Sequence, residues 1–147
     1  MKGLNSSRRQ GGFTLLEVMM VLVIIGVLAS LVAPNILGNR DRANTQKVVA
    51  DISGLENALQ MYYAHNSVMP TTEQGLEALV QRPTSSPEPR NYQTGGYIQR
   101  LPSDPWGNDY VLLSPGEVSR FDLCSAGPDL QLGTEDDICN FNLQDYQ

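Results

Sequence analysis

The sequence predicts an α+β protein in which one long N-terminal α-helix is followed by a small head with an antiparallel β-sheet. Residues 13–33 form an almost entirely apolar run. Residues 48–62 repeat apolar side chains at spacings of four and three, which is typical of one face of a helix. Further along the chain, residues 110–113 and 120–124 are short segments rich in β-forming side chains. The second half of the helix is therefore expected to pack against the sheet.

The apolar run is long enough to cross a membrane. It holds 21 residues, and only three of them carry polar side chains: Thr14, Glu17 and Ser30. At ~1.5 Å per residue, such a helix spans roughly 31 Å, close to the ~30 Å hydrocarbon core of a bilayer. A signal peptide has a shorter run of ~7–15 apolar residues and a small-x-small cleavage site after it. Residues 13–34 are therefore predicted to form a retained transmembrane helix.

Glu17 is the ionisable residue of this run. A carboxylate inside an apolar span is costly to bury, so it is a functional candidate by default. The plainer alternative is that Glu17, which lies near the end of the helix, extends its carboxylate to the lipid headgroups.

Residues 35–63 are predicted to continue the helix with one apolar face. Five side chains make that face: Val48, Ile52, Leu55, Leu59 and Tyr62. Charged residues lie between them, so the face is expected to cover the core of the head. Pro34 lacks a backbone N–H and is expected to kink the helix or melt it locally just before Asn35.

Residues 64–147 are predicted to form the head. A second, short helix is expected near its start, with Thr71 or Thr72 as the N-cap. Ser114-Pro115-Gly116 predicts the turn between the two strands. A head of this size buries little apolar surface by itself, so a disulfide or a metal is expected to stabilise it.

The charge of the chain argues against a nucleic-acid partner, and its residue types argue against an enzyme. The formal net charge is −6, and three of the ten basic residues precede Gly12 with no acidic residue among them. The remainder is strongly acidic, whereas binding to phosphates needs a basic face. With one histidine, His65, neither a Ser-His-Asp nor a Cys-His catalytic set can be built.

Cys124 and Cys139 are the two cysteines of the chain. An even pair in a small domain is typical of a disulfide in an oxidising compartment, and two buried free thiols are the alternative. The basic residues on the two sides of the apolar run balance, so they do not set an orientation. The cysteine pair favours export of the C-terminal part, with the N-terminus in the cytoplasm.

An acidic loop is the candidate metal site. Four carboxylates lie within nine residues: Asp129, Glu135, Asp136 and Asp137. Hard oxygen ligands on a flexible loop suit Ca²⁺. The loop is not an EF-hand, because the residues that follow Asp129 lack the further oxygen ligands which that motif needs. A solvated acidic loop without metal is the alternative.

The N-terminal residues resemble the prepilin processing signature, in which a short basic leader precedes Gly12, Phe13 and Glu17 at the start of an apolar run. Pro34 matches a proline that pilin-like helices carry. The resemblance implies that a prepilin peptidase removes residues 1–12 by cleaving between Gly12 and Phe13, and that the new Phe13 amine is methylated. Glu17 lies roughly 6 Å further along the helix axis, where its carboxylate is expected to pair with the Phe13 amine of a neighbouring subunit during assembly.

Three segments of the head resemble the major pseudopilin of type II secretion systems: residues 72–79, 96–98 and 101–108. The resemblance implies a pilin-like lollipop fold and a structural subunit that polymerises into a periplasmic pseudopilus, which helps drive folded exoproteins across the outer membrane. The implied partners are further copies of the chain, minor pseudopilins, an inner-membrane assembly platform and the prepilin peptidase. The implied location is the inner membrane with the head in the periplasm. A type IV pilin subunit and a membrane-tethered periplasmic binding domain are the alternatives.

The same resemblance implies that the acidic loop holds a structural Ca²⁺. The implied ligands are the carboxylates of Asp129, Asp136 and Asp137 and the carbonyl of Ala126. Cys124 and Cys139 bracket this loop and depart from the pattern of the family. A disulfide closing a loop of this size would stabilise the protein by about 3 kcal/mol in the chain-entropy model. We therefore hypothesise that the disulfide and calcium share the task of holding one loop.

Overall fold

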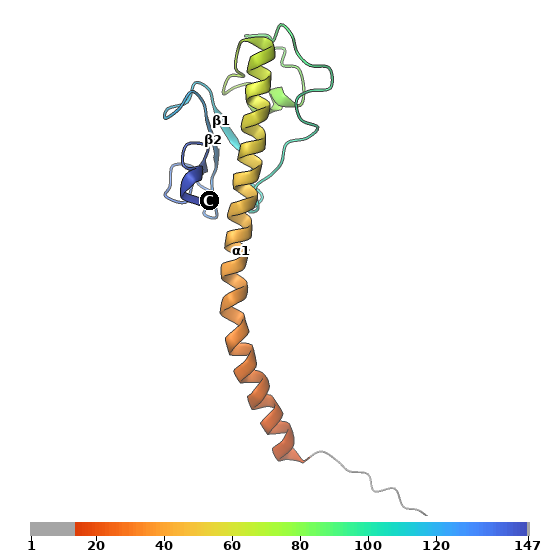
Figure 1. The fold of residues 1–147 in the computed structure, drawn as a ribbon, viewed down its shortest axis with the longest axis vertical. Helices are drawn as coiled ribbons and strands as arrows, with labels where there is room; N and C mark the ends of the chain where they lie inside the picture. Colours follow the sequence, from red (N-terminus) through yellow and green to blue (C-terminus); the bar gives the residue numbers. More distant parts are fainter. Residues whose placement is uncertain (1–13, 147) are drawn as a thin grey trace, which may run out of the picture. The chain divides into compact units, whose positions relative to one another are not determined.

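The structure, a computed structural model, describes residues 14–146, without the side chains of residues 31–39. The long helix α1 spans Leu15–Asn66 (Figure 1). The elements that follow are the 3-10 helix η1 (Leu76–Leu79), the strands β1 (Val111–Leu113), β2 (Asp122–Ser125) and β3 (Ile138–Cys139), and the 3-10 helix η2 (Leu143–Tyr146). The chain divides into two compact units, residues 1–40 and 41–147. The predicted α+β class is confirmed.

The first unit contains the N-terminal part of α1. The sequence predicted a kink or local melting of the helix at Pro34. The helix continues through Pro34, so it does not melt there, and the kink stays a prediction. Part of the span predicted for residues 13–34 lies outside the described residues, namely Phe13 and the side chains after Ser30. Within the described residues, no helix is both long and apolar enough to cross a membrane.

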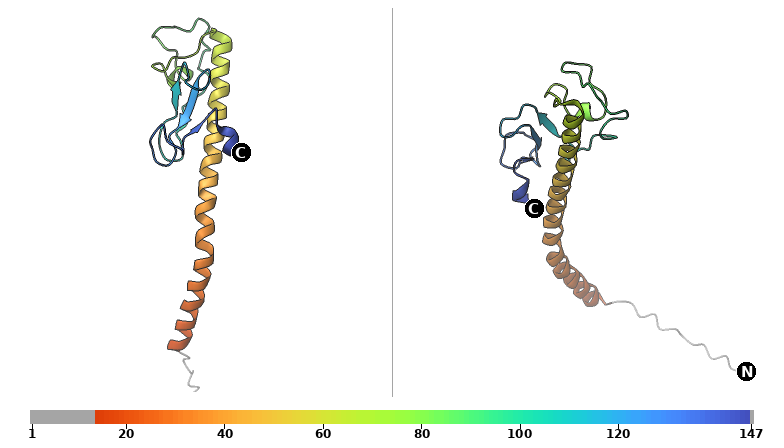
Figure 2. Two further views of the ribbon diagram at one scale, coloured as in Figure 1. Left: turned by 90° about the vertical axis from the view of Figure 1, so that its left-hand side faces the viewer. Right: turned by 45° about the horizontal axis from the view of Figure 1, so that its top comes forward.

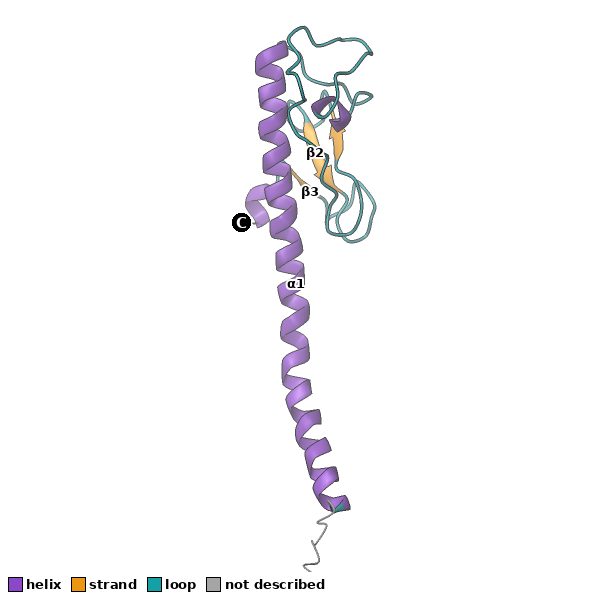
Figure 3. Ribbon diagram, turned by 90° about the vertical axis from the view of Figure 1, so that its right-hand side faces the viewer, coloured by secondary structure: helices purple, strands orange, loops and turns teal. Residues whose placement is uncertain are grey.

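The second unit is built around the C-terminal part of α1. The apolar face predicted for residues 48–62 is confirmed, because four of its five side chains are fully buried and Leu55 is 2% exposed. Figure 2 shows the sheet along one side of this part of α1. Figure 3 shows the same arrangement from the opposite direction, with η2 across the helix from the sheet. Leu143 of η2 also belongs to the core.

The sheet has three antiparallel strands in the order β1-β2-β3. Its central register places Leu112 opposite Leu123, and Ser125 opposite Ile138. Leu112, Leu123 and Ile138 are buried in the core that α1 shares. The two predicted strands are confirmed, and β3 completes the sheet. The loop between β2 and β3 is therefore held at both ends by strand pairing.

The short helix predicted near the start of the head is smaller than expected. Thr71 and Gln74 exchange two hydrogen bonds of 3.2 Å, each side chain accepting from the backbone N–H of the other residue. This motif closes a turn, and the helix begins only at Leu76. Gly75 adopts a φ of +59°, in the left-handed region, which interrupts a right-handed helix. The prediction of Thr71 or Thr72 as the N-cap is wrong, because Gly75 occupies that position.

Candidate functional site

The first candidate site is the start of α1, where Glu17 lies. The Glu17 backbone N–H donates to the Thr14 carbonyl at 3.1 Å and to Thr14 Oγ1 at 3.3 Å, so Thr14 caps the helix. Glu17 therefore lies in the first turn, where the helix dipole favours an acidic group. The predicted cleavage site between Gly12 and Phe13, and the Phe13 amine, lie outside the described residues.

The helix surface around Glu17 is apolar and uncovered within its own unit. Leu15 is 80% exposed, Met20 67% and Val23 66%, and these residues point in different directions around the axis. A helix that is apolar on all sides is stable when another apolar environment surrounds it, either lipid or other helices. The segment therefore needs a partner that the described residues of its own unit do not supply.

The second candidate site is the loop between β2 and β3, which carries the predicted calcium ligands. The Asp129 N–H donates to Asp136 Oδ2 at 3.2 Å, so the two ends of the acidic segment meet. The Thr134 hydroxyl donates to Asp136 Oδ1 at 2.6 Å. This hydrogen bond is the main cause that lowers the pKa of Asp136, which favours its ionised form. The Gly133 N–H donates to Asp137 Oδ2 at 2.6 Å.

The donor set of this loop fits a hard cation in its chemistry. Oδ1 of Asp137 is buried and has no hydrogen-bond partner among the described residues, which is costly for a carboxylate unless a cation or a donor approaches it. Gly127 lies so close to Asp136 that an added Cβ would be 2.5 Å from the Asp136 carbonyl oxygen. Ala126 is buried beside it. Across the part of the chain that is described, no three acidic, His or Cys side chains gather into one metal-binding group.

The predicted disulfide is confirmed. Cys124 and Cys139 are bonded to each other, and they lie directly opposite in the register of β2 and β3. The alternative of two free thiols is therefore wrong. The bond closes the base of the acidic loop, one residue pair, Ser125 and Ile138, before the loop begins.

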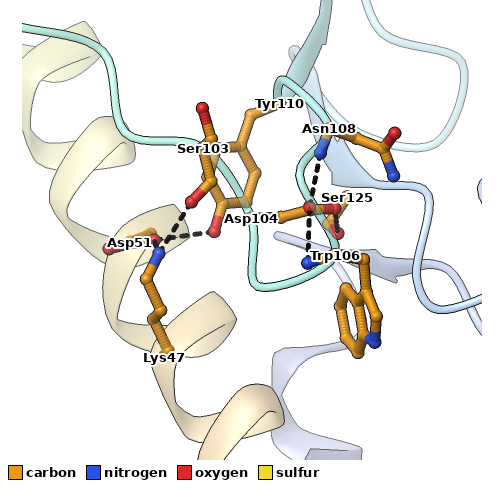
Figure 4. A network of polar contacts seen from close by, with 8 residues as sticks. All are labelled: Lys47, Asp51, Ser103, Asp104, Trp106, Asn108, Tyr110 and Ser125. Carbon is orange, nitrogen blue, oxygen red and sulfur yellow. Dashed lines mark hydrogen bonds and ion pairs between the residues drawn. The ribbon is translucent and has the colours of Figure 1, made fainter.

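A third group of polar contacts links α1 to the turn at residues 103–109 (Figure 4). Lys47 Nζ donates to Asp51 Oδ2 at 2.6 Å and to the Ser103 carbonyl at 2.7 Å. The Tyr110 hydroxyl donates to the same Asp51 oxygen at 2.8 Å. Burial and then this hydrogen bond raise the pKa of Tyr110, which keeps its phenol neutral. Sequence reasoning missed this group. The i, i+4 spacing of Lys47 and Asp51 on a helix could have predicted their ion pair, but not the contacts to Ser103 and Tyr110.

Asp104 organises the turn itself, and it too was missed as a functional candidate. Its Oδ1 accepts the backbone N–H groups of Trp106 at 3.0 Å and of Asn108 at 2.7 Å. Its Oδ2 accepts the hydroxyl hydrogen of Ser125 at 2.8 Å. The Asp104 N–H donates to the Asn108 carbonyl at 2.9 Å, which closes the turn. The turn therefore contacts α1 on one side and the end of β2 on the other.

Comparison with known proteins finds a matching family profile for each of two stretches of the chain. Residues 35–141 match the family profile described as "Type II secretion system (T2SS), protein G". Residues 7–33 match the profile described as "Prokaryotic N-terminal methylation motif".

Relatives of known role are similar to the chain over nearly its full length. The type II secretion system core protein G of Aeromonas hydrophila is 61% identical over 140 residues, covering 95% of this chain and 98% of the relative. The corresponding protein of Vibrio cholerae is 62% identical over 143 residues, covering 95% and 97%. The crystal structure of the major pseudopilin from the type 2 secretion system of enterohaemorrhagic Escherichia coli matches with a TM-score of 0.70 and 57% identity, covering 73% of this chain and 90% of that one.

Proposed function

The chain belongs to the type II secretion system protein G family, the family of the major pseudopilin, and on this premise we propose that it polymerises through the N-terminal part of α1 into a periplasmic pseudopilus. The filament helps drive folded exoproteins across the outer membrane. The observation that carries the proposal is the apolar helix segment of residues 15–30, exposed on all sides and bearing one carboxylate, Glu17. Neighbouring copies of the same segment would supply the environment that this surface needs.

Assembly follows processing at the N-terminus. A prepilin peptidase cleaves between Gly12 and Phe13 and methylates the new amine, in keeping with the methylation motif over residues 7–33. The mature helix then presents a cation at Phe13 and an anion at Glu17, roughly 6 Å apart along the axis. In an apolar bundle, the carboxylate of one subunit pairs with the amine of the next. This pairing fixes the stagger between subunits.

Before assembly the subunit is anchored in the inner membrane, with its N-terminus in the cytoplasm and its head in the periplasm. The disulfide supports this orientation, because such bonds persist in oxidising compartments. The further partners are minor pseudopilins and the inner-membrane assembly platform.

The test compares Glu17→Gln and Glu17→Val with the matched control Glu73→Gln, which removes a carboxylate from the exposed surface of the head. Removing one partner of a buried ion pair costs about 3–5 kcal/mol, or at least about 100-fold in the association constant. Both Glu17 variants should be processed and inserted normally, yet should fail to form sheared filaments and fail to secrete an exoprotein. The control should do both. Filaments of normal yield from Glu17→Val would contradict the proposal.

The loop between β2 and β3 is proposed to bind a structural Ca²⁺. Asp129, Asp136 and Asp137 would supply carboxylate oxygens and Ala126 a carbonyl oxygen. Bound calcium would neutralise the clustered charge and hold the loop in one conformation. Oδ1 of Asp137, which is buried and finds no hydrogen-bond partner in the described part of the chain, supports the proposal. To bind the ion, the carboxylates must exchange part of their present N–H and O–H donors for the metal.

Thermal unfolding of the full-length protein in detergent tests the calcium proposal. Calcium at about 100 times its Kd should raise the unfolding free energy by about 2.7 kcal/mol, whereas magnesium should not. Asp129→Asn should lose most of this rise. Glu135→Gln is the matched control from the same loop and should keep it. A wild-type melting temperature that is equal in calcium and in chelator would refute the site.

A further inference from the structure

Asp104 uses its two carboxylate oxygens for separate tasks. It is only 5% exposed. Oδ1 accepts both backbone N–H groups of its own turn, from Trp106 and Asn108. Oδ2 accepts the hydroxyl hydrogen of Ser125 at 2.8 Å. The turn is already closed by the two bonds to Oδ1, so the bond from Ser125 to Oδ2 instead links the turn to the end of β2.

Ser125 passes this contact on to the acidic loop. It is the last residue of β2 and is fully buried. Its hydroxyl has one hydrogen, which goes to Asp104, and its lone pairs are then free to accept. The donor that they accept is the Gly127 N–H, at 3.3 Å. The carboxylate of Asp104 thus fixes the direction of the hydroxyl, and the hydroxyl holds the first backbone amide of the loop beyond Ala126.

The position of Gly127 is critical for the loop. Its φ is +65°, and its Cα approaches the backbone and the side chain of Asp136, so that an added Cβ would lie 2.9 Å from Asp136 Oδ2. The residue before it, Ala126, carries one of the proposed ligands, and Asp136 carries another. A small rotation of the backbone at Gly127 would therefore move two proposed ligands relative to each other.

We propose that Asp104 and Ser125 are positioning residues of the calcium loop, an inference that rests on the calcium site proposed above. Neither residue would bind the ion. They hold the Ala126–Gly127 backbone in place from the side of α1, because the turn that contains Asp104 also binds Lys47 through the Ser103 carbonyl. The loop is thus held at its base by the disulfide and at its entry by this hydrogen-bonded pair.

The test is the calcium affinity of Ser125→Ala in the full-length protein in detergent, measured by calorimetric titration well below its melting temperature. Groups that orient metal ligands typically contribute about 10–100-fold to metal affinity, so the Kd should rise about 10–100-fold. The matched control is Ser119→Ala. Its hydroxyl donates to Asp122 Oδ1 at 2.9 Å, at the other end of β2. This control should bind calcium like the wild type, because among the described residues its serine–carboxylate pair makes no hydrogen bond to the acidic loop.

Hydrogen exchange of residues 125–138 gives a second readout that does not depend on calcium. In Ser125→Ala this segment should exchange faster, and in Ser119→Ala it should not. Asp104→Asn gives the same information if Ser125→Ala fails to fold. It keeps an acceptor for the turn and presents an NH₂ group to Ser125, so the hydroxyl must turn round and lose its acceptor.

The outcomes separate the inference from the calcium site. If wild-type protein does not bind calcium, both are overturned. If wild-type protein binds calcium and Ser125→Ala or Asp104→Asn binds it equally tightly, the calcium site stands and the positioning role is wrong. A lowered melting temperature with an unchanged Kd would reduce the pair to a purely structural contact and would also contradict the inference.

Discussion

Replacing both cysteines by alanine should lower the unfolding free energy by about 3 kcal/mol. The bonded residues are 15 positions apart, and in the chain-entropy model a closed loop of this length restricts the unfolded chain by about that amount. Loss of packing adds to this value, because Cys139 is buried at 3% exposure and its Sγ is removed, whereas Cys124 is only partly buried.

Urea unfolding followed by tryptophan fluorescence measures this loss, since Trp106 is the single tryptophan and packs against the core. With a slope of roughly 2 kcal/mol per M, typical of a small protein, the midpoint should fall by about 1.5 M. Wild-type protein kept in reductant should show the same midpoint as the double variant. A fall of less than about 0.3 M in both would refute the reasoning from loop closure.

The same variant also tests whether the disulfide and calcium share one task. Without the bond, the free energy that orders the loop must come from calcium binding itself, so the calcium affinity of the double variant should be lower than that of the wild type. An unchanged affinity would mean that the disulfide and the ion act independently.

Two further predictions concern buried groups. The Tyr62 hydroxyl is buried without a partner among the described residues, so Tyr62→Phe should leave the unfolding free energy at pH 7 unchanged or raise it by up to about 1 kcal/mol. Burial raises the pKa of Tyr62 to about 12, above ~10 in the unfolded chain. The neutral Tyr62 phenol therefore stabilises the fold fully below pH 10, and this contribution is lost as the pH rises to about 12. In Tyr62→Phe the unfolding free energy should fall less steeply with pH above 10, and equal pH profiles of the variant and the wild type would contradict this.

Gly127→Ala should abolish calcium binding, because the added Cβ would collide with Asp136. Gly133 has a φ of +92° and open space around its Cβ, so Gly133→Ala should cost only the backbone strain, about 1–3 kcal/mol. Equal calcium affinities of the two glycine variants by titration would show that the close approach at Gly127 is unimportant.

Local patterns in the sequence were sufficient for much of the fold. The spacing of Val48, Ile52 and Leu59 identified the buried face of α1, because helical periodicity is a local property. The two β-forming segments identified β1 and β2. The short helix is present, but its start was predicted too early, because Thr71 and Thr72 are favourable N-cap residues by type. Gly75 turns the backbone away, so that the helix begins only at Leu76.

The polar contacts of the head could not be predicted in the same way. Tyr110 and Asp51 are 59 positions apart, and Asp104 and Ser125 are 21 positions apart. No spacing rule connects such residues, because the packing of the sheet on α1 brings them together. The disulfide could be predicted from the sequence, because the chain has two cysteines and they allow only one pairing.

The choice between the predicted functions depends on the head rather than on the N-terminus. A type IV pilin would share the processing signature, so that signature does not discriminate. The match of residues 35–141 to the protein G family and the similarity to a solved major pseudopilin decide for the pseudopilin.

The central claim is that the chain is processed before its apolar segment and keeps that segment for assembly. The most direct measurement is the intact mass and the N-terminal residue of the mature protein purified from cells. The account predicts a chain that lacks residues 1–12 and begins with an N-methylated Phe13. A chain that retains Met1, or one that begins after Ala33 and has therefore lost the apolar segment, would contradict it.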